Sequence, residues 1–107
     1  MKREIIKIKD YAGTFAENKD KAKELRMSKI MPALSKKEVV ELDFKGVSGT
    51  TQSFVHALIS EPMRQFRDLA LENLEYKNCS SEVKEIIKTV YDYMQESFND
   101  NGQNDEQ

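Results

Sequence analysis

The stretch 39–59, with the sequence VVELDFKGVSGTTQSFVHALI, constrains the fold more than any other part of this chain. Val40, Leu42 and Phe44 are separated by acidic residues, which predicts a strand with one apolar face. A glycine-rich turn follows, and Ser53 opens a predicted helix. In a parallel sheet, the end of a strand and the start of the next helix form the edge where ligands and modifications usually lie. Ser53 is therefore the first candidate functional residue.

The hydrophobic pattern of the whole chain predicts alternating strands and helices. In order, they are a strand at 4–9, a helix at 15–34, a strand at 38–47, a helix from Ser53 to about Leu69, a strand within 71–78 and a last helix that Ser80 or Ser81 caps. The order β-α-β-α-β-α implies parallel pairing through crossover helices. We therefore predict a small α/β domain whose mainly parallel sheet is covered chiefly on one face by helices.

Two prolines fall inside the predicted helices. Pro32 predicts a kink or an end near Ile30, followed by an irregular piece up to Lys37. Pro62 predicts two helical pieces that meet near Glu61, because proline suits the first turn of a helix.

A chain of 107 residues is long enough for one hydrophobic core. We predict a single domain at 1–98, followed at 99–107 by a polar and acidic tail that is disordered because it has no apolar residue to bury. No apolar run approaches the roughly 20 residues that span a membrane, and no signal peptide is recognisable. The single cysteine, Cys79, cannot form an internal disulfide. These features predict a cytoplasmic protein without a membrane partner, and they leave the oligomeric state open.

The net charge of −2 hides two parts of opposite sign. Residues 2–37 contain eleven basic and five acidic side chains, whereas 38–107 contain six basic and fourteen acidic ones. We interpret Lys19, Lys23 and Arg26 as the solvated face of one helix. A nucleic acid or an acidic partner is the alternative, but no aromatic residues alternate with these bases to stack on nucleotides. We therefore do not expect nucleic acid to be the main partner.

Three short motifs of the central stretch give it a resemblance to a known family. They are Leu42-Asp43-Phe44 in the strand, Gly46-Val47 in the turn and Ser53-Phe54 at the helix start. Together they resemble the core of the STAS domain, the module of bacterial anti-sigma factor antagonists and of sulphate transporter tails. The chain resembles small STAS-like bacterial proteins still more closely, and this similarity includes IIKIKDYAGTF near the start and LEYKNCSSEVKEIIKTVYDY near the end.

The resemblance implies a regulatory module that binds another protein and is not an enzyme. In the antagonist branch, a partner kinase of the histidine-kinase-like ATPase fold phosphorylates a serine at the start of the helix after the central strand, and the phosphate controls binding. That serine matches Ser53. This chain has Thr51-Gln52-Ser53-Phe54-Val55 where the antagonists have Asp-Ser-Ser-Gly-Leu. A switch site and an ordinary helix cap are the two interpretations of Ser53.

The same edge of the sheet is the predicted partner-binding surface. Its predicted residues are Ser48, Gly49, Thr50, Thr51, Gln52, Ser53, His56, Asn78 and Cys79. A second hypothesis is an accessory domain that binds a small molecule or nucleic acid through this edge or the basic first helix.

A third hypothesis is a Cys79-dependent enzyme in which Ser53, His56 and Cys79 lie at one edge and the histidine acts as base. We favour the binding module, because no third group is identifiable to orient the histidine. One histidine and one cysteine fall short of a zinc site, and no phosphate-binding or dinucleotide-binding motif occurs. We predict no catalytic residue, no metal and no cofactor.

Overall fold

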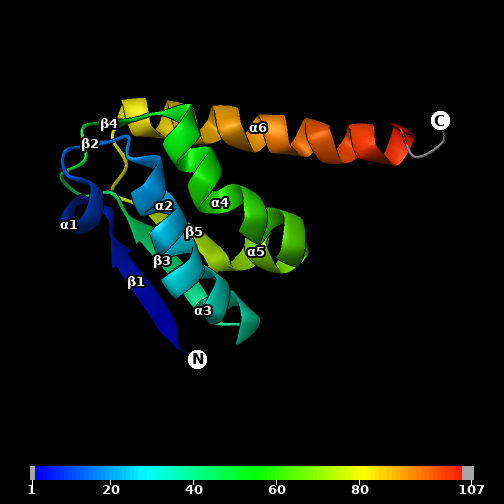
Figure 1. Ribbon diagram of the computed structural model, residues 1–107, viewed down its shortest axis with the longest axis horizontal. Helices are drawn as coiled ribbons and strands as arrows, with labels where there is room; N and C mark the ends of the chain where they lie inside the picture. The colour runs from blue at the N-terminus through cyan, green and yellow to red at the C-terminus, as the bar shows by residue number, and fades with distance from the viewer. Residues whose placement is uncertain (1, 105–107) are drawn as a thin grey trace.

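The computed structural model describes residues 2–104, with side chains described for 2–96. Its centre is a three-stranded parallel sheet with the order β1–β3–β5 (Figure 1). The strands are β1 (Arg3–Lys7), β3 (Val39–Asp43) and β5 (Leu74–Lys77). Ile6 of β1 lies opposite Leu42 of β3, which lies opposite Tyr76 of β5. A second parallel sheet pairs two short strands, β2 (Phe15–Ala16) and β4 (Gly49–Thr50).

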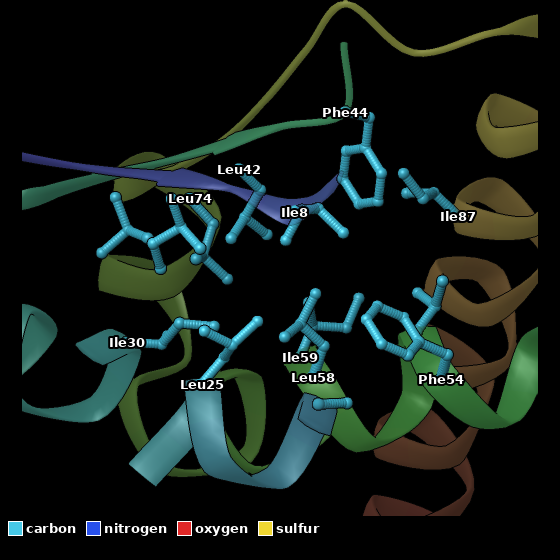
Figure 2. Packing of buried hydrophobic residues seen from close by; sticks show 14 of the residues in the cluster. Ile8, Leu25, Ile30, Leu42, Phe44, Phe54, Leu58, Ile59, Leu74 and Ile87 are labelled. Atoms are coloured by element: carbon cyan, nitrogen blue, oxygen red, sulfur yellow. The ribbon is translucent and has the colours of Figure 1, made fainter. Parts of the chain in front are cut away.

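The helices α2 and α4 pack on one face of the three-stranded sheet, and α6 lies beside α4 across the end where the strands stop (Figures 1 and 2). The helical elements are α1 (Ile8–Ala12), α2 (Lys19–Leu25), the π-helical turn η1 (Arg26–Ile30), α3 (Met31–Ser35), α4 (Gln52–Phe66), α5 (Asp68–Asn73) and α6 (Ser81–Asn104). This arrangement confirms the predicted α/β domain with a mainly parallel sheet covered on one face. Within residues 2–104, every helix is too short or too polar to traverse a lipid bilayer.

The hydrophobic core lies between the sheet and this helical layer. Figure 2 shows strand side chains such as Leu42 and Leu74 pointing toward side chains of the helices, among them Leu25 and Ile59. These side chains are buried, as the alternation of the strands and the spacing of the helices predict. Burial of a whole leucine or isoleucine side chain stabilises a fold by roughly 1.5–3 kcal/mol, so this layer is the main source of stability.

The opposite face of the sheet is open and polar. Arg3 forms ion pairs across the strands with Glu41 at 3.2 Å and Glu75 at 2.6 Å. Ile5 lies on the same face and is 51% exposed. Glu41, one of the acids predicted on the second strand, therefore lies on this face, and Arg3 on the neighbouring strand β1 compensates its charge.

The first predicted helix, at 15–34, begins later than expected. Phe15 and Ala16 form β2 instead, because they pair with β4 far away in the sequence. The helix starts at Lys19, where Asn18 Oδ1 accepts hydrogen bonds from the amides of Asp20 (3.0 Å) and Lys21 (3.2 Å). An asparagine cap of this kind satisfies amides that the helix itself leaves free.

The two prolines have different effects on the helices. The first predicted helix is divided near Ile30 as predicted, since η1 ends at Ile30 and α3 begins at Met31 with Pro32 in its first turn, but α3 takes the place of the predicted irregular piece. Helix α4 is continuous through Pro62, so the predicted break near Glu61 is wrong. The ring removes one backbone hydrogen bond, and burial of Pro62 together with its neighbours on α4 offsets that cost.

The ends of three other elements also differ from the prediction. The first strand ends at Lys7, so Ile8 is buried from α1 rather than from a strand. The second strand, predicted at 38–47, ends at Asp43, whereas the third strand, Leu74–Lys77, lies within 71–78 as predicted. Helix α6 continues to Asn104, into the stretch for which the sequence predicts disorder. Residues 105–107 lie outside the described residues, and the disordered tail stays a prediction.

Candidate functional site

The candidate site lies where the parallel strands end and where α2, α4 and α6 begin (Figure 1). Thr51 forms the cap of α4, since its Oγ1 accepts a hydrogen bond of 3.1 Å from the Phe54 amide. The interpretation of Ser53 as the helix cap is therefore wrong. Ser53 lies in the first turn of α4, is exposed and makes no hydrogen bond through its hydroxyl to the residues that the structure describes.

The residues that replace Gly-Leu of the antagonist pattern have a structural role. Phe54 is fully buried and Val55 is 1% exposed, so both belong to the core. Thr51, at the position of the antagonist Asp, supplies the helix cap. The departure from the pattern thus changes how the start of α4 is held, while Ser53 stays on the surface.

Ser53 and His56 line one groove of about 450 Å³, as their spacing on one helical face predicts. Its other walls come from the start of α2 and from the middle of α6. The lining residues are Lys19, Gln52, Ser53, His56, Ala57, Thr89, Val90 and Tyr93. We call this hollow the Ser53 groove.

Five residues of this groove are not among the site residues that the sequence predicts, namely Lys19, Ala57, Thr89, Val90 and Tyr93. Thr89 and Tyr93 belong to α6, which the sequence predicts only as the last helix, and Lys19 belongs to the helical face that the sequence predicts to be solvated. Tyr93 is 63% exposed, an uncommon setting for an aromatic side chain next to a buried stripe. Because this exposure is known only from the structure, no signal in the sequence alone marks α6 as a wall.

The loops that follow β3 and β5 are joined to each other. Ser80 Oγ donates a hydrogen bond of 3.1 Å to the Ser48 carbonyl and accepts one of 3.2 Å from the Val83 amide, so it also caps α6. Asn78 Nδ2 donates to Asp43 Oδ1 at 2.9 Å, with Asn78 in a left-handed backbone conformation (φ +58°). The predicted neighbourhood of these loops is therefore present.

Asp43 is held in its charged form by this arrangement. The Asn78 side chain and then the Lys45 amide, at 2.9 Å, donate to the carboxylate and hold the pKa of Asp43 below its usual value. The ends of β3 and β5 are thus connected by a charge-assisted hydrogen bond.

Gly49 and Thr50 are buried and have a structural role. Thr50 Oγ1 donates a hydrogen bond of 2.6 Å to the Ala16 carbonyl. A Cβ atom on Gly49 would lie 2.9 Å from the Phe15 ring. These two residues hold β4 against β2 and leave Ser48, Gln52 and Ser53 as the exposed part of this loop.

Cys79 does not join Ser53 and His56. It lines a different groove with Tyr76 and Lys84 on the other side of α6, although β3 and β5 are neighbours as the enzyme hypothesis requires. Burial raises the pKa of the Cys79 thiol, against an opposite effect of Lys84, so the environment favours the neutral thiol. Within the described part of the chain, no three His, Cys, Asp or Glu side chains are placed to hold a metal ion.

The basic residues of α2 are not equivalent. Lys19 and Lys23 are exposed, whereas Arg26 is partly buried and donates a hydrogen bond of 3.2 Å to the Ala57 carbonyl. Arg26 thus connects η1 to α4 and is not part of the solvated face on which the sequence placed it.

The parallel sheet, the one-sided helical layer and the exposed serine at the start of α4 define a small α/β domain of the STAS type. The chain matches the family model described as a STAS-like domain of unknown function (DUF4325) over residues 21–84. Because this match covers more than half of the chain, the protein belongs to that STAS-like family. No curated protein and no solved structure matches significantly. Family membership confirms the resemblance and is consistent with a regulatory interaction module.

Proposed function

We propose that this protein is a non-catalytic regulatory module that binds a signalling partner through the Ser53 groove. The partner class is an ATPase of the histidine-kinase-like fold, and phosphorylation of Ser53 switches the complex. The observation that carries this proposal is the exposed Ser53 hydroxyl, which is free of hydrogen bonds to described residues and lies on the wall of a groove of about 450 Å³.

The position suits an added phosphate. Ser53 lies in the first turn of a helix of 15 residues, where the positive end of the helix dipole favours a dianion. Lys19 lines the same groove and supplies a cation to it. A new charge of about −2 on this wall would change a largely apolar contact surface, so binding before and after phosphorylation would differ.

Phosphorylation is tested by incubating the full chain with a histidine-kinase-like ATPase encoded beside it, together with ATP. Mass spectrometry is expected to find phosphate on Ser53 and none after the replacement Ser53→Ala. Binding of Ser53→Ala to the ATPase should match the parent protein, whereas Ser53→Asp should change the affinity by at least about tenfold, a free-energy difference of about 1.4 kcal/mol.

The matched control is Ser35→Asp, because Ser35 is exposed and ends α3 just before the start of β3, at the opposite end of the sheet. This variant adds the same charge and should bind like the parent. If a tight complex forms and neither Ser53 variant changes it, Ser53 is not the switch.

A small-molecule ligand is a second candidate for the same groove. A volume of about 450 Å³ lies within the range of roughly 300–1,000 Å³ that small-molecule sites occupy. Binding of such a ligand should be weakened by Ala57→Trp, which fills the groove, without any ATPase or ATP present. A fragment screen that finds no ligand whose affinity depends on Ala57 would exclude this candidate.

A further inference from the structure

A second groove, of about 480 Å³, lies on the opposite face of α6 from the Ser53 groove. One wall is the chain at the end of β5, and the other is one face of α6. The first wall consists of Tyr76 and Lys77 of β5 and of Asn78 and Cys79 in the turn after it, and the helix wall consists of Lys84, Ile87, Lys88 and Tyr91. The helix residues are spaced three, four and seven positions from the first, so they form a single stripe on one face of α6. We call this hollow the β5 groove.

The β5 part of the first wall lies at a free edge of the sheet. β5 is the last strand in the order β1–β3–β5, and among the described residues no strand pairs with its outer side. The Lys77 carbonyl accepts a hydrogen bond of 2.9 Å from the Phe44 amide, so the backbone of Lys77 faces β3. Because the direction alternates along a parallel strand, the N–H and C=O groups of Tyr76 point away from β3, toward the free edge.

The side chains of the β5 groove combine an apolar floor with a basic rim. Ile87 is buried, and Tyr76 and Tyr91 are partly buried, so they form the floor. Lys84 and Lys88 are exposed at the rim. Lys84 makes no ion pair within the described part of the chain, and Lys88 pairs at 2.8 Å with Asp92. Exposed pairs of this kind contribute only about 0–1 kcal/mol, so Lys88 can exchange its partner.

We propose that the β5 groove binds an extended acidic segment of a partner protein, which adds to the sheet as a further strand beside β5. A free edge and an adjacent pocket are the two features by which a domain recognises an extended peptide. Strand β5 has four residues, Leu74–Lys77, and at about 3.3 Å each they span roughly 13 Å, so the strand that pairs with them has about four residues. Its apolar side chains contact the floor, and its carboxylates pair with Lys84 and Lys88.

Charge decides between this partner and a second copy of the protein. Two β5 edges that pair with each other would bring the lysine rims of both copies to the same interface. Like charges would then face each other at a short distance, whereas an acidic segment neutralises them. This second surface is separate from the Ser53 groove, because α6 lies between the two grooves and presents a different face to each.

The test uses isotope-labelled full-length protein and a capped pentapeptide in which glutamate and valine alternate. Addition of the peptide is expected to shift the amide resonances of residues 76–79 and 84–91. The double variant Lys84→Glu and Lys88→Glu should weaken the affinity about tenfold, because two favourable surface pairs become repulsive. Lys23→Glu with Lys36→Glu makes the same change of charge on exposed residues elsewhere and should leave the affinity unchanged.

A peptide with methylated backbone nitrogens separates strand addition from simple charge attraction. It keeps both carboxylates and valines, but it cannot donate backbone hydrogen bonds to β5, and we expect its affinity to fall at least tenfold. Equal binding of the methylated peptide, or shifts that appear outside the β5 groove, would overturn the proposal. Self-association of the protein alone through residues 76–79 would overturn it as well, because the occupant would then be a second copy.

Discussion

Replacement of Thr51 by alanine tests the assignment that leaves Ser53 available for modification. In the structure, Thr51 Oγ1 accepts the hydrogen bond of 3.1 Å from the amide of Phe54, a residue that is itself fully buried. Loss of such a cap costs about 1 kcal/mol, with a range of roughly 0.5–2 kcal/mol. In a domain of about 100 residues, 1 kcal/mol corresponds to a decrease of roughly 4–8 °C in Tm.

The matched variant is Ser53→Ala, two positions further along the chain. Because the Ser53 hydroxyl is exposed and makes no hydrogen bond to described residues, we expect a change within about 0.5 kcal/mol. Thr51→Ser should keep the stability of the parent, since it keeps the accepting oxygen. Thermal unfolding followed by circular dichroism measures all three. A decrease in Tm for Ser53→Ala as large as that for Thr51→Ala would show that Ser53 is the cap and would refute this reasoning.

Three further predictions concern the core, the end of β3 and the thiol. Leu42→Ala should lower the free energy of unfolding by about 2–5 kcal/mol in urea titrations, because Leu42 is fully buried, whereas Ile5→Ala on the open face should cost less than about 1 kcal/mol. The pKa of Asp43 is lowered in the folded state, so the charged Asp43 side chain stabilises the fold above its unfolded pKa. This contribution to the free energy of unfolding is lost as the pH falls through the folded pKa. Asp43→Asn should therefore flatten the loss of stability that the parent shows below about pH 4. The pKa of Cys79 is raised by burial, so alkylation near neutral pH should be slower than for an unfolded control, and a faster reaction would contradict the assignment of a neutral thiol.

Much of the fold follows from local patterns in the sequence. The alternation in the central strand places Val40, Leu42 and Phe44 on one apolar face, and all three are buried. The order of elements implies parallel strands with crossover helices, and the sheet has that topology. These features are predictable because each depends on the spacing of residues within one element.

The features that the sequence did not reveal depend on contacts between distant residues. Strand β2 exists because Phe15 and Ala16 pair with Gly49 and Thr50, more than thirty positions away, and no local pattern marks so short a strand. The continuous path of α4 through Pro62 depends on burial of the ring, which propensity alone does not include.

The candidate site was predictable in part for the same reason. Ser53 and His56 share a helical face, so their neighbourhood follows from their spacing. The opposite wall, with Thr89 and Tyr93, depends on how α6 packs beside α4. The separation of Cys79 from Ser53 likewise depends on the position of α6, which lies between the two grooves.

The most direct test of the proposed function is to map where the histidine-kinase-like ATPase contacts this domain. Amide chemical shifts of the isotope-labelled protein, measured during titration with the ATPase, report each contact separately. We predict that the largest changes fall on residues 52–57 and 89–93, the two walls of the Ser53 groove, and that Ser53→Asp alters them. Changes confined to the open face of the sheet or to the β5 groove would contradict the Ser53 groove as the site of regulation.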